Sequence, residues 1–69
     1  MAETVQNNVR TLRKERGVTQ EDLAIAVGVS RQTVIAIEKG SYVPSVLLAL
    51  KLAKYFDLSV EELFSYEKA

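Results

Sequence analysis

The chain has 69 residues, nine basic and nine acidic side chains, and neither cysteine nor histidine. A chain of this length forms one domain, whose single core supplies a net stability of roughly 3–5 kcal/mol. The missing cysteines exclude disulfides and thiolate metal sites, and the missing histidines remove the commonest metal ligand and general base. No apolar run approaches the roughly 20 residues of a membrane span, and the N-terminus lacks the features of a signal peptide. We therefore expect a cytoplasmic protein that is not an enzyme and carries no cofactor or metal.

The charges are unevenly distributed along the chain. Residues 1–56 contain eight basic and five acidic side chains, a local charge of +3, whereas residues 57–69 have a local charge of −3. This asymmetry is compatible with a basic face for nucleic acid and an acidic C-terminal segment kept away from phosphate. Charged helix faces are common, so the asymmetry alone does not define a partner.

Glycines and hydroxyl side chains divide the chain into short helices. The three glycines follow apolar-periodic segments, where a left-handed residue ends a helix without steric cost: Gly17, Gly28 and Gly40. Four hydroxyl residues stand where a helix start needs a cap: Thr19, Ser30, Ser45 and Ser59. Asp22 and Glu62 lie three residues after two of these caps and complete capping boxes, and Pro44 rigidifies the approach to another. With their caps, the predicted helices cover about residues 5–16, 19–27, 30–38, 45–56 and 59–64.

Each predicted helix has an apolar stripe that can face a common core. The expected core residues are Val5, Val9, Leu12, Leu23, Ala24, Val27, Val34, Ile37, Leu48, Ala49, Leu52, Ala53, Phe56, Val60, Leu63 and Phe64. Five helices with short connections and no strand pattern predict a compact all-α domain. We assign one domain to residues 1–69, with its core over about 5–64 and loosely determined ends at 1–4 and 65–69.

The segment from Thr19 to Gly40 has the pattern of a helix-turn-helix, with Ala24 as the small contact residue and Gly28 as the turn. Its motifs are Gly17-Val18-Thr19-Gln20-Glu21-Asp22-Leu23-Ala24, Gly28-Val29-Ser30-Arg31-Gln32-Thr33 and Ile37-Glu38-Lys39-Gly40, followed by Pro44-Ser45. Over about residues 5–64 the chain resembles the DNA-binding domain of the lambda-repressor and Cro type, the Xre-like helix-turn-helix regulators. The resemblance implies a five-helix bundle and a small transcriptional regulator whose third helix enters the major groove of double-stranded DNA.

The resemblance assigns base contacts to the third helix. Its first turn, with Arg31, Gln32 and Thr33, faces base edges in this docking mode; arginine suits guanine, glutamine suits adenine, and threonine offers a methyl or a hydroxyl. Ala36 aligns with a family position that often approaches bases, where it can contact only an apolar surface such as a thymine methyl. Without the surrounding motif, Arg31 and Gln32 would be ordinary solvated residues.

Phosphate contacts are implied at both ends of the motif. Gln20 corresponds to the family glutamine that holds a phosphate beside a helix N-terminus, and Thr19 either shares this role or only caps the helix. A second clamp corresponds to Lys39 and the loop after it, in which Tyr42 either contacts phosphate or packs on the domain. The expected phosphate contacts are Thr19, Gln20, Lys39, Ser41, Tyr42 and Ser45.

Other residues are assigned to structure and assembly. Arg13 and Glu38 resemble a family pair whose partly buried ion pair fixes helix orientation, a structural role that they share with Ala24 and Gly28. The last helix offers more apolar area than a short helix ordinarily buries alone, so we expect a dimer interface at Val60, Leu63, Phe64 and Tyr66. Four apolar residues stand where the family more often has polar ones, and would mark a partner surface if they clustered: Ile25, Ala26, Ile35 and Leu47.

The resulting hypothesis is a homodimeric, sequence-specific transcriptional regulator, a repressor, that binds an inverted repeat in double-stranded DNA. The alternative is an antitoxin-like or adaptor module, in which the helix-turn-helix is a scaffold for a protein partner such as a toxin or a co-regulator. Arg31→Ala separates the two, because only a DNA reader would lose sequence discrimination. Enzymatic use of the acidic pairs Glu21/Asp22 and Glu61/Glu62 is disfavoured, because adjacent helix residues do not face each other.

Overall fold

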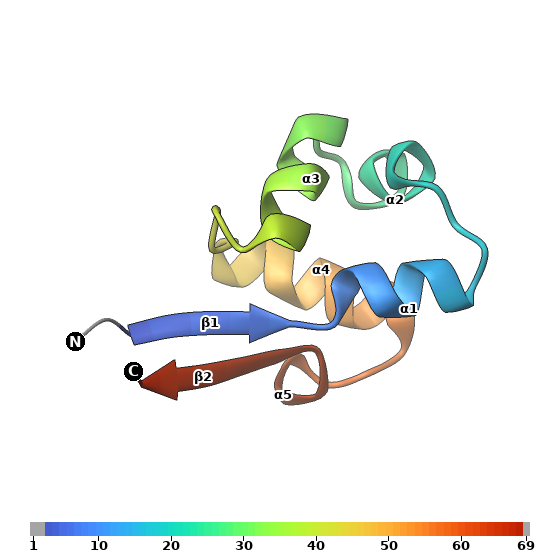
Figure 1. The fold of residues 1–69 in the computed structure, drawn as a ribbon. Coiled ribbons are helices and arrows are strands. Elements are labelled where there is room, and N and C mark those ends of the chain that lie inside the picture. Colours follow the sequence, from blue (N-terminus) through green and yellow to red (C-terminus); the bar gives the residue numbers. More distant parts are fainter. Residues whose placement is uncertain (1–2, 69) are drawn as a thin grey trace.

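The computed structural model describes residues 3–68, which form five helices and one two-stranded antiparallel sheet. In chain order the elements are β1 (Glu3–Asn7), α1 (Val9–Glu15), α2 (Gln20–Val27), α3 (Arg31–Lys39), α4 (Val46–Phe56), α5 (Val60–Leu63) and β2 (Phe64–Lys68). The helices form one compact body, and the two strands run side by side away from it (Figure 1). None of the helices in residues 3–68 is both long enough and apolar enough to cross a membrane.

The four helix starts predicted from a capping hydroxyl are confirmed. The Thr19 hydroxyl accepts the Asp22 N–H at 3.0 Å, and the Asp22 carboxylate accepts the Thr19 N–H at 3.4 Å. Ser59 and Glu62 form the same capping box before α5, with distances of 2.8 and 3.2 Å. The two remaining predicted caps also accept N–H groups of the first turn: Ser30 and Ser45. Each cap satisfies a donor that a helix start leaves unpaired, which stabilises a helix by about 1 kcal/mol.

The turn of the helix-turn-helix depends on Gly28. Its φ of +75° lies in the left-handed region, and its backbone lets the Val29 N–H return to the Ala24 carbonyl at 3.0 Å. A side chain at this position would meet no neighbour within 4 Å, so the glycine is required for its backbone conformation and not for space. The sharp reversal brings α3 directly onto α2.

The ends of the chain correct the all-α prediction. Val5, expected on the first helix, lies in β1 opposite Tyr66 of β2, and the register extends from Glu3 opposite Lys68 to Asn7 opposite Phe64. The first helix begins only at Val9, because the Asn7 side chain accepts the Val9 N–H at 3.1 Å and ends the strand there. The expectation of loose ends is therefore wrong for residues 3–4 and 65–68, while residues 1, 2 and 69 lie outside the described part.

The core combines residues from all five helices. The fully buried apolar residues are Val9, Leu23, Ala24, Val27, Val34, Ile37, Leu48, Leu52, Ala53, Phe56 and Leu63. Every other residue of the predicted stripes packs against this core, apart from Val5 and the partly buried Ala49. Spacing alone therefore identified the inward side of each helix.

The short last helix buries part of the apolar surface that was expected at a dimer interface. Leu63 is 1% exposed, and Val60 and Phe64 pack against the core of their own chain. The N-terminal segment also meets this helix: the Asn8 N–H donates to the Leu63 carbonyl at 3.0 Å, and β1 pairs with the β2 strand that follows. Of the four residues expected at the interface, Tyr66 alone is mostly exposed, at 65%.

We expect Asn7→Ala to lower the free energy of unfolding by about 1–2 kcal/mol. The substitution removes the acceptor for the Val9 N–H and a 3.0 Å hydrogen bond from the Asn7 amide to the Ile37 carbonyl, which joins the first strand to α3. Urea unfolding followed by circular dichroism measures the loss. Asn8→Ala is the matched control, because its amide makes one exposed contact of 3.4 Å with the Glu62 carbonyl and should cost less than about 0.5 kcal/mol. Equal losses in the two variants would contradict the role of Asn7.

Candidate nucleic-acid interface

The helix α3 buries one face and exposes the other. Val34 and Ile37 are 1% and 2% exposed and fix the helix on the core. Arg31 and Gln32 are exposed on its first turn, and within residues 3–68 neither side chain makes a hydrogen bond or ion pair. The Thr33 hydroxyl lies 3.1 Å from that of the cap Ser30. The rigid helix therefore presents two long polar side chains whose donors are available to a partner.

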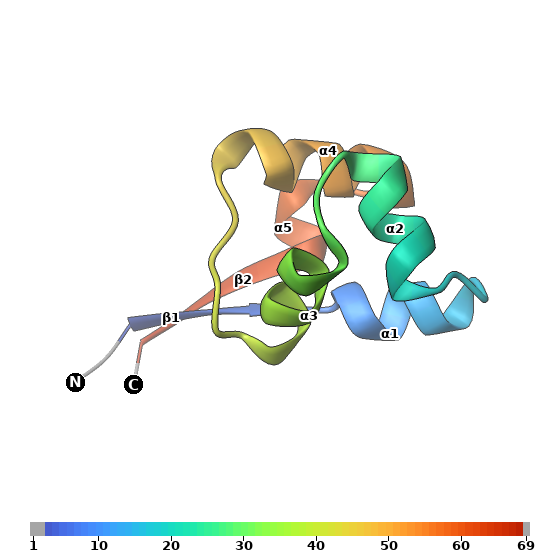
Figure 2. The same ribbon diagram turned by 90° about the horizontal axis from the view of Figure 1, so that it is seen from above.

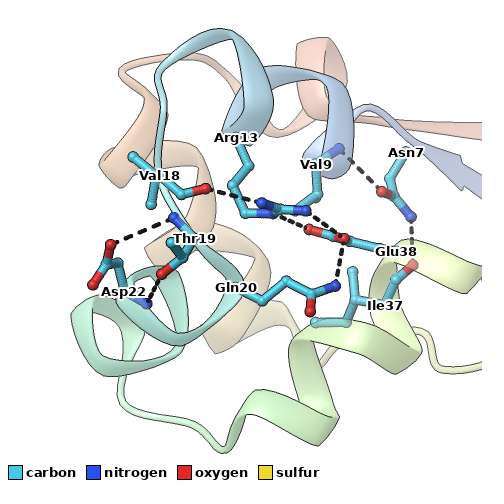
Figure 3. A network of polar contacts seen from close by, with 9 residues as sticks. All are labelled: Asn7, Val9, Arg13, Val18, Thr19, Gln20, Asp22, Ile37 and Glu38. Atoms are coloured by element: carbon cyan, nitrogen blue, oxygen red, sulfur yellow. Dashed lines mark hydrogen bonds and ion pairs between the residues drawn. The ribbon is translucent and has the colours of Figure 1, made fainter.

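A buried polar network sets the orientation of α3. Arg13 of α1 donates from Nε to Glu38 Oε2 at 2.7 Å and from Nη2 to Glu38 Oε1 at 3.2 Å, which forms the expected ion pair. A third donor, Arg13 Nη1, bonds the Val18 carbonyl at 2.9 Å, and Gln20 Nε2 donates to Glu38 Oε1 at 3.1 Å. Figure 3 shows these side chains converging from α1, α2 and the end of α3. One carboxylate thus ties together the three helices that carry the candidate interface.

The two charges of this pair are mutually stabilised. Burial raises the pKa of the Glu38 carboxyl, but hydrogen bonds from Arg13 and Gln20, together with the positive charges of Arg13 and Arg10, more than offset it. The net effect places the Glu38 pKa below the ordinary value of a glutamate. The hydrogen bond to Glu38 in turn raises the pKa of Arg13. The pair is therefore fully ionised at neutral pH, although the two side chains are only 10% and 4% exposed.

The residues expected to contact phosphate differ in what they already bind. Gln20 uses one amide N–H for Glu38, which leaves one donor for a phosphate. The Ser41 hydroxyl donates to the Ala36 carbonyl at 3.2 Å. Thr19 and Ser45 are helix caps. Lys39 and Tyr42 are exposed, and the partly buried Ala36 lies on α3.

Two cationic residues of α1 belong to the same surface and were missed by the sequence analysis. A recess of about 540 Å³ is lined by Arg10, Arg13, Lys14, Thr19, Gln20, Glu21 and Arg31. A neighbouring recess of about 370 Å³ is lined by Arg10, Gln20, Ile35, Glu38 and Lys39. The signal was present in the spacing, because residues 10, 13 and 14 share one side of a helix and Arg13 was already expected to face α3. Arg10 and Lys14 thus extend the basic surface from α3 across α1.

This arrangement defines a class of protein. A short helix pair with a left-handed glycine turn, an exposed polar first turn and a flanking cationic recess is a helix-turn-helix domain with a surface suited to a polyanion.

Comparison with known proteins agrees with this assignment. The Helix-turn-helix family model matches residues 9–63. The uncharacterized HTH-type transcriptional regulator MJ0272 of Methanocaldococcus jannaschii is 52% identical over 63 residues, which are 91% of this chain and 96% of that protein. The cryptic phage CTXphi transcriptional repressor RstR of Vibrio cholerae is 39% identical over 59 residues, 86% of this chain and 53% of that protein. The crystal structure of the restriction-modification controller protein C.AhdI from Aeromonas hydrophila superposes with a TM-score of 0.74 at 36% identity, covering 80% of this chain and 83% of that one. The chain therefore belongs to the helix-turn-helix family of the lambda-repressor and Cro type, whose members are DNA-binding transcriptional regulators.

We expect Glu38→Ala to lower the free energy of unfolding by about 3 kcal/mol, because it leaves the Arg13 charge buried without its partner. The relative affinities of the folded variant for different DNA sequences should change little. Thermal unfolding and competition binding measure the two effects. The double variant Arg13→Met/Glu38→Leu removes both charges and should recover much of the lost stability. An unchanged melting temperature for Glu38→Ala would show that the pair does not hold the helices together.

The depressed pKa of Glu38 also predicts how stability depends on pH. An ionised Glu38 contributes its full stabilisation above the ordinary glutamate pKa of about 4.3, and the contribution is lost as the pH falls through the lower folded-state pKa. Urea unfolding from pH 7 downward should therefore show a steeper loss of stability below about pH 4.5 in the native protein than in Glu38→Gln. Parallel pH profiles would mean that Glu38 does not contribute.

Proposed function

We propose that this chain is a repressor that binds an inverted-repeat operator as a homodimer and reads each half-site with the first turn of α3. The observation that carries the proposal is the difference between the two ends of this helix. Its far end is fixed by Glu38 in the buried network, whereas Arg31 and Gln32 are exposed and have no partner within residues 3–68. A rigidly held helix fixes the positions from which its side chains reach the bases, which allows them to discriminate one base from another.

The chemistry of the first turn suggests which bases it distinguishes. An arginine pairs with the O6 and N7 acceptors of guanine through two donors, and a glutamine pairs with N6 and N7 of adenine. We assign these contacts to Arg31 and Gln32, with Thr33 and Ala36 supplying apolar contact to a thymine methyl. Because the Thr33 hydroxyl is close to that of Ser30, its methyl group is the more available part for a base.

Phosphate contacts orient the domain on the duplex. We assign them to Lys39 and Tyr42 after α3, to the exposed start of α2 at Thr19 and Gln20, and to the capped turns at Ser41 and Ser45. Arg10 and Lys14 extend the same cationic surface and join this set. Binding should therefore weaken steeply as salt increases, because each neutralised phosphate releases counterions.

The symmetric operator follows from the proposed dimer. Two reading helices must enter successive major grooves on one side of the duplex, so the half-sites should lie about 10 bp apart, or a multiple of it. A protein bound across such a site excludes other proteins from the same DNA. Repression is the outcome that we propose, and the similarity to RstR of Vibrio cholerae, a transcriptional repressor, supports it.

Selection of bound sequences from a random DNA pool tests this function. We expect enrichment of an inverted repeat, and Arg31→Ala should relax the preference at one position by about 1–3 kcal/mol. Lys39→Ala is the matched control, because it also removes one positive charge of α3. It should weaken binding to all sequences alike and reduce the slope of log affinity against log salt concentration by about one. Selection that enriches no sequence would contradict the proposal, as would an Arg31→Ala variant with unchanged preference.

A further inference from the structure

We propose that a second copy of this chain docks on an apolar patch at the start of α4. The patch consists of four residues, Val43, Val46, Leu47 and Leu50, from α4 and the connection before it. The inference rests on the proposed function, because it supplies the contact that joins two reading helices. It also replaces the interface expected at the last helix, whose apolar residues pack within their own chain.

The side chains of the patch are far more exposed than the fold requires. Their exposed fractions are 60% for Val43, 77% for Val46, 64% for Leu47 and 54% for Leu50. The opposite side of the first half of α4 is already anchored by the buried Leu48. The first half of this helix is thus apolar on both sides, which is typical of a helix that is covered on both sides. Several large apolar side chains within one short segment mark an interaction surface.

The charge pattern favours a second copy as the occupant. Residues 40–50 form an uncharged run of eleven residues, bounded by Lys39 and Lys51. In a two-fold interface each residue near the axis meets its own copy or a close neighbour, so charged residues there repel and uncharged ones do not. The whole chain has a formal net charge of zero, and two copies therefore approach without net repulsion.

The shape of this side also suits self-association. Val43 lines a recess of about 360 Å³, together with residues of β1, the end of α3 and Tyr66. Of the four patch residues, Val43 lines this recess, and Val46 follows it three positions later in the chain. An isologous interface is self-complementary, so a protruding side chain of one copy can fill a recess of the other.

The location of the patch is compatible with simultaneous DNA binding. The connection after α3 lies on the side of the molecule away from α1, and the start of α4 borders the turn between α2 and α3, where Leu47 lines a recess with Val27, Gly28 and Val29 (Figure 2). None of the four patch residues belongs to α3, whose first turn carries the proposed base contacts. The domain measures 35 × 23 × 22 Å. Two touching copies can therefore place their reading helices about 34 Å apart, the distance between successive major grooves on one side of DNA.

Sedimentation equilibrium without DNA tests the docking directly. We expect the native chain to form a dimer. The double variant Val46→Glu/Leu50→Glu should raise the dissociation constant of this dimer by about tenfold or more, because negative charges buried in the interface would repel those of the second copy. Both positions are exposed, so circular dichroism should show an unchanged fold. Ile25→Glu is the matched control: Ile25 is 72% exposed on α2 and lies outside the patch. A native chain that stays monomeric, or a dimer weakened equally by Ile25→Glu, would overturn the inference.

Single cysteines locate the contact, since the native chain has none. Cysteine is introduced singly at Val43, Val46, Leu47 and Leu50, and each variant is treated with a short bismaleimide. At least one patch variant should give a covalent dimer, and the Ile25→Cys and Tyr66→Cys controls should not. Cross-linking of Tyr66→Cys without any patch variant would place the second copy on the sheet and overturn the inference.

The two proposals fail separately in these experiments. A dimer that is cross-linked through the patch but shows no sequence preference in the DNA selection would support the proposed docking surface and contradict the proposed repressor function. A monomer that still selects one half-site would sustain the reading helix and contradict the docking surface.

Discussion

The fold depends on a single buried carboxylate that serves three helices. Glu38 stands at the end of α3 and receives hydrogen bonds from Arg13 of α1 and Gln20 of α2. Removing either charge leaves the other unpaired in a desolvated site, which is strongly destabilising. The network therefore keeps its geometry. The reading helix is consequently fixed at one end by polar contacts and along its inner face by Val34 and Ile37. These contacts therefore fix the positions of the side chains that we expect to face DNA.

Local signals made most of the fold predictable. Capping boxes at Thr19 and Ser59, the left-handed Gly28 and the apolar spacing act over a few residues, and each appears in the structure as expected. The Arg13–Glu38 pair became predictable because a family resemblance supplied a partner 25 positions away. Pattern alone contains no such information.

The features that sequence reasoning missed are all non-local. β1 and β2 are only five residues long and pair across nearly the whole chain, so neither one shows its partner in its own pattern. Leu63, which directly precedes β2, is buried in the core instead of lying at a surface. The sequence predicted only a DNA contact for Gln20. Its additional hydrogen bond to Glu38 depends on how α2 and α3 cross, which the sequence pattern does not show. The spacing of Arg10 and Lys14 placed them on the side of α1 that carries Arg13, but their proximity to Arg31 depends on the tertiary fold.

The pairing of β1 with β2 also sets an order of events during synthesis. Glu3 and Lys68 are opposite each other, so the first strand has no partner until the ribosome has released residues 64–68. The helices α1 to α4 contact one another through much shorter stretches of chain and can assemble earlier, since nearby contacts form fastest. A nascent chain thus acquires its helix-turn-helix before its sheet. Closure of the sheet is the last step in this order.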